Sequence, residues 1–155
     1  MIAVLQRAAH AAVRVEGEVV GEISRGLLIL LGVAAEDTKA DADALAAKIL
    51  KCRIFCDDAD KMNLSVTDVG GEALVVSNFT LLANYAHGNR PDYMGAARPA
   101  QANELYEYFV SLMREGLSHV ATGVFGAEMR VSLEGDGPVT IVMDSNVLRA
   151  KEKNK

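Results

Sequence analysis

Three polar side chains interrupt an apolar segment at residues 74–82, whose sequence is LVVSNFTLL. They are Ser77, Asn78 and Thr80, which supply two hydroxyls and an amide. Buried without partners, such groups cost roughly 1–3 kcal/mol each, so they need either a hydrogen-bond network or a chemical function. A strand end at which polar residues meet solvent would produce the same pattern, and both interpretations stay open at this point.

No conventional catalytic motif accompanies this cluster. The three histidines, His10, His87 and His119, belong to no Gly-x-Ser-x-Gly, HExxH, Walker or GxGxxG pattern. The remaining candidates are the cluster itself and a turn at Gly137-Pro138. A site built from these residues would act through backbone amides, hydroxyls and substrate placement rather than through a strong side-chain base.

The elements that must position these residues are strands at both ends of the chain and helices between them. Apolar runs and alternation predict strands at 2–5, in a hairpin over 13–23, and at 26–33, 74–82, 119–124, 129–133 and 139–143. Helical spacing predicts one helix from Thr38, with Asp41 completing a capping box, to near Phe55. A second helix should begin after Pro99 and end at Gly116.

This order predicts an α+β fold, in which an antiparallel or mixed β-sheet curls toward a barrel and two main helices pack on it. Because the helices cover one face of the sheet, curling or a second subunit must cover the other. A chain of 155 residues builds one core, so residues 1–145 are expected to form a single domain. Residues 146–155 form a charged C-terminal tail that we expect to be frayed.

Composition and charge exclude several classes of protein. The longest apolar run, 27–35, is too short for a membrane span and no signal peptide is visible, so we expect a cytoplasmic protein without a membrane partner. The formal net charge of −5 offers no broad surface for DNA, so any nucleic acid must be gripped locally. Cys52 and Cys56 are expected to be reduced thiols. The acidic loop 57–61 lacks the EF-hand pattern, so neither a metal nor another cofactor is predicted.

Two segments, SNFTL at 77–81 and GPVT at 137–140, resemble the signatures of the D-aminoacyl-tRNA deacylase family, Ser-Gln-Phe-Thr and Gly-Pro-Val-Thr. Other similar segments follow the family's order: Gln6-Arg7, GLLILLGV at 26–33, KMNLS at 61–65, GNRP at 88–91, GAA at 95–97, ATGVFGAEM at 121–129 and MDS at 143–145. Each segment alone is weak, but their order and spacing make the resemblance specific.

The resemblance implies an enzyme that hydrolyses the ester between a D-amino acid and the 3′-terminal adenosine of tRNA, without a metal. It also implies a homodimer in which Gly137 and Pro138, joined by a cis peptide bond, project into the partner's active site. Their carbonyls would hold the α-ammonium of the substrate, and an L side chain would collide with them. Because glycine has no side chain to reject, glycyl-tRNA is expected as a second substrate.

The same resemblance assigns the remaining site residues. The pocket would be lined by Ser77, Asn78, Phe79 and Thr80. Their backbone amides would stabilise the oxyanion, and Thr80 would orient the ester or the water. Phe125 and Ala96 would contact the terminal adenine. Arg7 would brace the Gly-Pro turn, although a surface ion pair is an equal alternative for this side chain.

Three departures from the family pattern bear on how efficiently the protein would hydrolyse its substrate. Asn78 stands where the family usually has Gln, Gly135 stands where Asn is common, and His87 replaces a frequent Lys. One alternative is therefore a noncatalytic RNA-end or nucleotide-binding module on the same scaffold, in which the departures have abolished turnover. A hydrolase with Thr80 as a covalent nucleophile is a third possibility, although no base stands beside Thr80 in the sequence to activate it.

Overall fold

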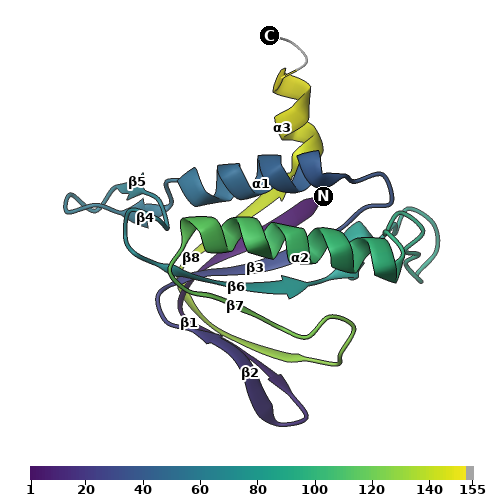
Figure 1. The fold of residues 1–155 in the computed structure, drawn as a ribbon, viewed down its shortest axis with the longest axis horizontal. Coiled ribbons are helices and arrows are strands. Elements are labelled where there is room, and N and C mark those ends of the chain that lie inside the picture. The colour runs from purple at the N-terminus through teal and green to yellow at the C-terminus, as the bar shows by residue number, and fades with distance from the viewer. Residues whose placement is uncertain (153–155) are drawn as a thin grey trace.

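The computed structural model describes residues 1–152, which form an α+β fold with a curled sheet and helices on one side of it (Figure 1). The strands are β1 (Ile2–Val15), β2 (Glu18–Ile23), β3 (Gly26–Gly32), β4 (Phe55–Cys56), β5 (Met62–Leu64), β6 (Glu72–Ser77), β7 (Val120–Thr122) and β8 (Arg130–Asp144). The helices are α1 (Lys39–Lys51), the short 3₁₀ helix η1 (Phe79–Leu82), α2 (Pro99–Gly116) and α3 (Ser145–Glu152). The predicted fold class is confirmed.

β1 is the strand around which the sheet is built, because both of its edges are paired along most of its length. One edge pairs with β3 through residues 2–8 and with β2 through residues 11–15. The other edge pairs with β8 through residues 2–14. These pairings are antiparallel, whereas β3, β6 and β7 run parallel to one another, so the sheet is mixed.

The sequence predicted a short strand at 2–5 and a separate hairpin from residue 13, but β1 is continuous through both. The connecting stretch is rich in alanine, which has a low intrinsic preference for strands and hides the signal. Its members Ala8, Ala11 and Ala12 are fully buried. Pairing on two edges therefore overrides local propensity here.

The sheet curls until β2 approaches β7 at the open side of the barrel (Figure 1). A Cβ atom at Gly21 would collide with the carbonyl oxygen of Thr122, so this approach requires a glycine in β2. The inside of the curl holds a small apolar cluster made of Ala8, Ala11, Val13, Ile23, Leu28, Leu74 and Val76. Curling therefore buries part of the sheet face that the helices do not cover.

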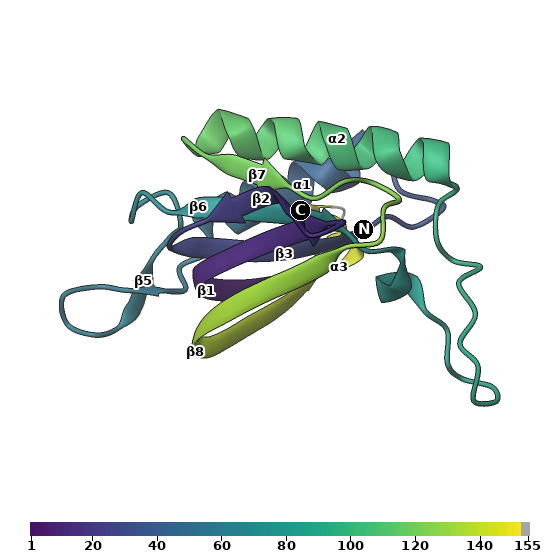
Figure 2. The same ribbon diagram turned by 90° about the horizontal axis from the view of Figure 1, so that it is seen from below.

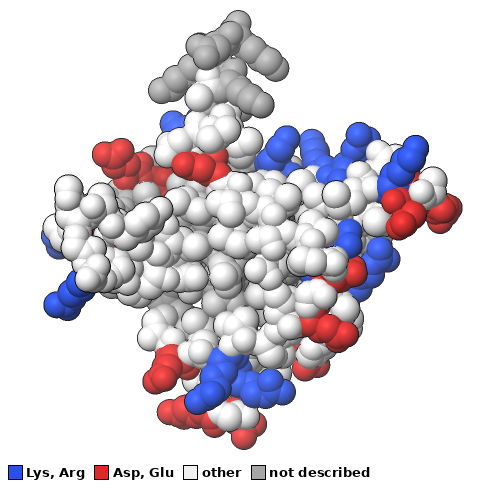
Figure 3. Space-filling model, turned by 180° about the vertical axis from the view of Figure 1, so that it is seen from behind, with Lys and Arg blue, Asp and Glu red and all other residues white. Residues whose placement is uncertain are grey.

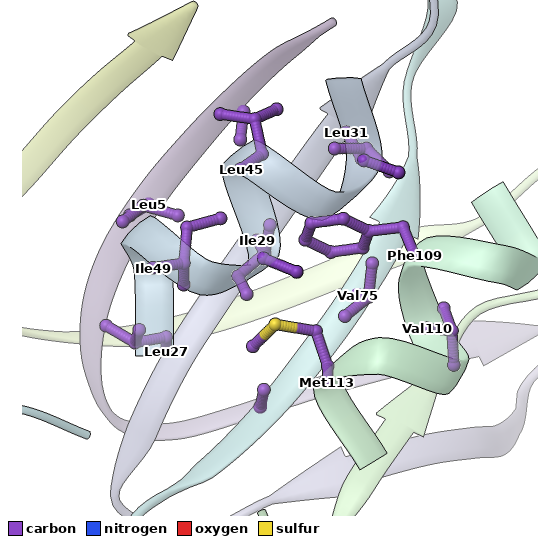
Figure 4. Close-up of a cluster of buried hydrophobic side chains, with 14 of the residues drawn as sticks. Leu5, Leu27, Ile29, Leu31, Leu45, Ile49, Val75, Phe109, Val110 and Met113 are labelled. Carbon is purple, nitrogen blue, oxygen red and sulfur yellow. The ribbon is translucent and has the colours of Figure 1, made fainter. Parts of the chain in front are cut away.

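Helices α1 and α2 lie on the opposite face, as Figure 2 shows for α2, and close the main core. Side chains at helical spacing point down to the strands: Leu45 and Ile49 from α1, and Phe109, Val110 and Met113 from α2, over Leu5, Leu27, Ile29, Leu31 and Val75 (Figure 4). Within residues 1–152, no helix combines the length and apolar character needed to cross a membrane.

Two predicted boundaries were wrong. The segment 74–82 is not one strand, because β6 ends at Ser77 and the chain turns into η1. The strands predicted at 129–133 and 139–143 are instead one strand, β8, because pairing with β1 continues on both sides of the Gly-Pro turn.

The ends of two helical segments also differ from prediction. Helix α1 ends at Lys51 rather than near Phe55, because Phe55 is fully buried in a short ladder with Leu64 of β5. The expected frayed tail from residue 146 is instead helical, as α3, up to Glu152. Residues 153–155 of that tail lie outside the described residues.

The buried carboxylate of Asp41 ties α3 to α1. It accepts hydrogen bonds from the Ser145 hydroxyl at 2.8 Å and from the Arg149 guanidinium at 3.0 Å. It also accepts the backbone N–H of Thr38 at 2.9 Å, which confirms the predicted capping box. Burial alone would raise the pKa of Asp41, but these hydrogen bonds and the nearby Arg149 charge outweigh it and lower the pKa from 3.8 to about 2.

Replacing Asp41 by Asn should therefore lower the free energy of unfolding by about 2–3 kcal/mol near neutral pH. A folded-state pKa below the unfolded value stabilises the fold above pH 3.8, and this contribution is lost as the pH falls toward 2. The difference between the parent and Asp41→Asn should thus shrink across this window in urea denaturation. A difference that does not change with pH would contradict the assignment, and the exposed Asp58→Asn variant serves as the control.

Candidate active site

A cavity of about 550 Å³ opens where β3 and β6 end and η1 begins. Five residues singled out in the sequence line it: Ser77, Asn78, Phe79, Ala96 and Phe125. The other lining residues are Val33, Tyr93, Ala97, Pro99, Ala102, Gly126, Ala127 and Met129. Folding thus brings together segments that are far apart in the sequence, namely the end of β6, the loop before α2 and the loop after β7.

The polar interruption of the apolar segment marks the point where the sheet ladder ends. The N–H of Asn78 donates to the carbonyl of Leu31 at 2.8 Å, so this amide is already engaged and cannot serve an oxyanion as expected from the sequence. The chain then turns into η1, whose first residues are Phe79 and Thr80. At the start of a helix the first N–H groups have no intrahelical acceptor, so these two amides remain as donors.

Thr80 does not line the cavity itself, but its hydroxyl donates to Oδ1 of Asn78 at 2.5 Å. An amide oxygen is too weak a base to take this proton and create an alkoxide. The lone pairs of the Thr80 oxygen, in contrast, remain able to accept a hydrogen bond. The geometry therefore suits an orienting hydroxyl better than a covalent nucleophile. It also gives Asn78, the residue that departs from the family pattern, a local partner.

Aromatic side chains form the walls of the cavity. Phe79 is 56% exposed and meets Tyr93 edge to face, with ring centroids 5.1 Å apart. Phe125 packs against Tyr106 on the other side, at 6.1 Å. Such faces suit a purine base, which stacks on aromatic rings. Tyr93 was missed by the sequence analysis. It is an aromatic residue in a loop otherwise rich in glycine and proline, which was the available signal.

The Gly137-Pro138 turn is a bulge in β8. Gln6 pairs with Thr140 and Ala8 with Gly135, so the four residues 136–139 stand opposite Arg7 alone. They must leave the ladder, and the turn is accordingly exposed to solvent. Its peptide bond is cis, as expected. Neither Gly137 nor Pro138 lines the cavity of its own chain.

Arg7 holds this bulge to the body of the protein. Its buried guanidinium donates from Nε to the carbonyl of Asp136 at 3.0 Å and forms an ion pair with the Asp136 carboxylate at 3.2 Å. It also donates to the carbonyl of Ile54 at 2.8 Å. These contacts include both the turn backbone and an ion pair to the half-exposed Asp136 side chain, and bracing of the turn by Arg7 stays a prediction.

The cavity carries no charge of its own. Its lining contains no Asp, Glu, His, Lys, Arg or Cys. Beneath it, the hydroxyl of Tyr106 donates to the carbonyl of Val75 at 2.8 Å, and burial raises the pKa of Tyr106 to about 12. This tyrosine therefore stays neutral and structural. Among the described residues, no cluster of three or more His, Cys, Asp or Glu is placed to hold a metal ion. The lining supplies the Ser77 hydroxyl, the Asn78 side chain and aromatic rings.

The sequence pattern of the D-Tyr-tRNA(Tyr) deacylase family matches residues 4–144, which include the cavity, Arg7 and the Gly-Pro bulge. The chain belongs to this family. A D-aminoacyl-tRNA deacylase of Pelobacter propionicus is 54% identical over 144 residues, covering 93% of this chain and 99% of the relative. A D-aminoacyl-tRNA deacylase of Anaeromyxobacter dehalogenans is 54% identical over 148 residues, with 96% and 99% covered.

Solved structures give the same fold. The c-Myc DNA unwinding element binding protein superposes with a TM-score of 0.89 at 39% identity, covering 93% of this chain and 98% of that one. A probable eukaryotic D-amino acid tRNA deacylase superposes with a TM-score of 0.80 over 92% of this chain and 98% of its own. Its identity of 16% means that this second likeness concerns the fold alone. The D-Tyr-tRNA(Tyr) deacylase family is thus the one that the sequence motifs resembled.

The contacts of Arg7 predict a large effect on stability when the side chain is shortened or made apolar. Arg7→Met leaves the Ile54 carbonyl without its donor and should lower the free energy of unfolding by about 2–4 kcal/mol. Arg7→Lys keeps the charge but loses the fork of donors, so about half of that loss is expected. Chemical denaturation measures both. A loss no larger than that of the exposed control Arg53→Met would contradict a bracing role.

Proposed function

We propose that this protein hydrolyses the ester bond of D-aminoacyl-tRNA in the cytoplasm, releasing free tRNA and the D-amino acid, and leaves L-aminoacyl-tRNA intact. The observation that carries the proposal is the convergence in one cavity of Ser77, Asn78, Phe79, Ala96 and Phe125, the positions carried over from the family motifs. The terminal adenine occupies the aromatic part of this cavity, beside Phe125 and Ala96. The ester then lies near the start of η1.

Attack on the ester carbonyl creates an oxyanion, which needs donors fixed in advance. The N–H groups of Phe79 and Thr80 supply them, since neither has an intrahelical acceptor. The Thr80 hydroxyl, whose proton is engaged with Asn78, accepts a hydrogen bond from the attacking water or from the neighbouring ribose 2′-hydroxyl. The cavity offers no carboxylate, imidazole or thiolate, the ligands that catalytic zinc prefers, so we propose a metal-independent reaction.

A second copy of this chain completes each site. The face opposite α1 and α2, where β8 lies, has a broad central area without charged side chains, and the charges gather at its margins (Figure 3). Val142 of β8 is 69% exposed, and the proposed interface would bury it. Because Gly137 and Pro138 do not line their own cavity, we propose a two-fold pairing that brings the bulge of each subunit to the cavity of the other.

Chirality is read by this bulge. The carbonyls of Gly137 and Pro138 bind the α-ammonium, and the space left at the α-carbon admits hydrogen but not a side chain in the L configuration. D-amino acids direct their side chains away from the bulge and are hydrolysed. Glycine carries no side chain, so glycyl-tRNA is hydrolysed as well.

Deacylation of D-tyrosyl-tRNA and L-tyrosyl-tRNA tests the proposal. The parent should hydrolyse only the D form. Pro138→Ala removes the ring that fixes the backbone of the bulge, so the preference for D over L should fall roughly tenfold or more. Pro91→Ala, in the loop before α2 and outside the cavity lining, is the control and should keep the preference.

Three other results would each change the proposal. No hydrolysis of D-tyrosyl-tRNA by the parent would end the proposal. Binding of a D-aminoacyl-adenosine analogue without turnover would identify a noncatalytic RNA-end-binding module instead. A trapped acyl-enzyme on Thr80 would replace the orienting hydroxyl with a nucleophile.

The dimer gives a separate prediction. Val142→Glu places a charge in the proposed interface, where burial without a partner costs several kcal/mol, so the protein should become monomeric. Because each cavity then lacks its bulge, hydrolysis of D-tyrosyl-tRNA should fall in parallel. Sedimentation and deacylation measure the two effects, with Val147→Glu on α3, 60% exposed in the parent, as the control. A monomeric variant with full activity and full chiral preference would refute completion of the site by a partner.

A further inference from the structure

Two arginines stand directly opposite each other where β1 meets β8. In this antiparallel pairing Val13 faces Val131 and Arg14 faces Arg130. Both guanidinium groups therefore project from the same face of the sheet. Both side chains are exposed. They line a second cavity of about 420 Å³ between the β1–β2 hairpin and the loop that precedes β8.

Such a pairing is unfavourable unless an anion joins it, because like charges opposite each other in a sheet destabilise it. Within the described residues, neither Arg14 nor Arg130 forms an ion pair or a side-chain hydrogen bond. Two carboxylates, Glu16 and Glu128, line the same cavity, but neither lies within 4.0 Å of either guanidinium nitrogen. The two guanidinium groups are thus free to bind a ligand.

This cavity adjoins the candidate active site. Ala127 lines both cavities, and its neighbours in the sequence are shared between them: Phe125, Gly126 and Met129 line the first, Glu128 and Arg130 the second. Figure 1 shows the segment after β6, the loop before β8 and the β1–β2 hairpin following one another along one edge of the molecule. A ligand strand that leaves the first cavity past Ala127 would therefore reach Arg14 and Arg130.

We propose that Arg14 and Arg130 together bind a backbone phosphate of the single-stranded RNA that precedes the terminal adenosine, an inference that rests on the proposed function. Guanidinium groups match phosphate geometry through paired hydrogen bonds, and two of them facing one phosphodiester remove their mutual repulsion. The protein has a net charge of −5, and in Figure 3 the basic side chains at the hairpin end are flanked by acidic ones. The grip on RNA is therefore local, and it positions the strand without reading its sequence.

The effect of removing the two arginines should depend on whether the substrate carries a phosphate upstream of the terminal adenosine. D-tyrosyl-adenosine has the ester and the base but no upstream phosphate, whereas D-tyrosyl-tRNA has both. The double variant Arg14→Gln, Arg130→Gln should raise KM for D-tyrosyl-tRNA roughly tenfold, with kcat nearly unchanged. It should hydrolyse D-tyrosyl-adenosine at the parent rate. Arg53→Gln, which removes an exposed arginine beside β4 at the far end of the molecule, is the control for the loss of charge.

The salt dependence of kcat/KM gives a second measurement, which a purely structural role of the two arginines would leave unchanged. For a single strand, each phosphate that the protein no longer neutralises reduces the slope of log(kcat/KM) against log salt by about 0.7, and this reduction should occur for tRNA only. Glu128→Gln, which removes a carboxylate from the same cavity, should lower KM for tRNA.

Equal losses on both substrates, or an unchanged KM and salt slope for tRNA, would overturn the proposal. Failure of the parent on D-tyrosyl-adenosine and tRNA alike would instead remove the proposed function.

Discussion

The contact between Arg7 and the bulge at 136–139 is the constraint on which the rest of this molecule depends. One residue of β1 faces four residues of β8, so the Gly-Pro turn must leave the sheet, and the Arg7 guanidinium fixes the direction in which it leaves. The same arginine reaches the Ile54 carbonyl, which connects the bulge to the segment after α1. In the proposed function this backbone distinguishes two mirror-image substrates and has to be rigid, which the contacts of the buried Arg7 guanidinium favour.

In the proposed function the cavity and the bulge are two halves of one site, and they lie apart in a single chain. The cavity is uncharged and contributes donors, an orienting hydroxyl and aromatic walls. The bulge has backbone carbonyls and is exposed to solvent. We propose that each half is incomplete without the other, and that fixed polar groups and the substrate's own ribose take the place of a catalytic base.

Much of the fold could be predicted from the sequence, because periodicity marked α1, α2, β3 and the return of strands near the C-terminus. The misses have physical causes. Alanine hid the continuity of β1, and pairing with β1 carried β8 through a glycine-proline stretch that locally indicates a turn. Asp41 converted an expected frayed tail into α3 through a contact that spans most of the chain.

The site was accessible to sequence reasoning through its motifs, but its geometry was not. No spacing rule places Ser77, Ala96 and Phe125 around one cavity, since Phe125 approaches Ser77 through the pairing of β6 with β7 and Ala96 through its bridge to Ala34. Engagement of the Asn78 amide with Leu31 likewise depends on where the parallel ladder stops. The cross-strand position of Arg14 and Arg130 follows from a register that is set across the bulge.

The most direct test of completion across two subunits is a crystal structure with a non-hydrolysable D-tyrosyl-adenosine analogue. We expect a two-fold dimer in which the adenine lies beside Phe125 and the α-ammonium contacts the carbonyls of the partner's Gly137 and the partner's Pro138. An α-ammonium held only by residues of the same chain, or an analogue bound to a monomer, would contradict this arrangement.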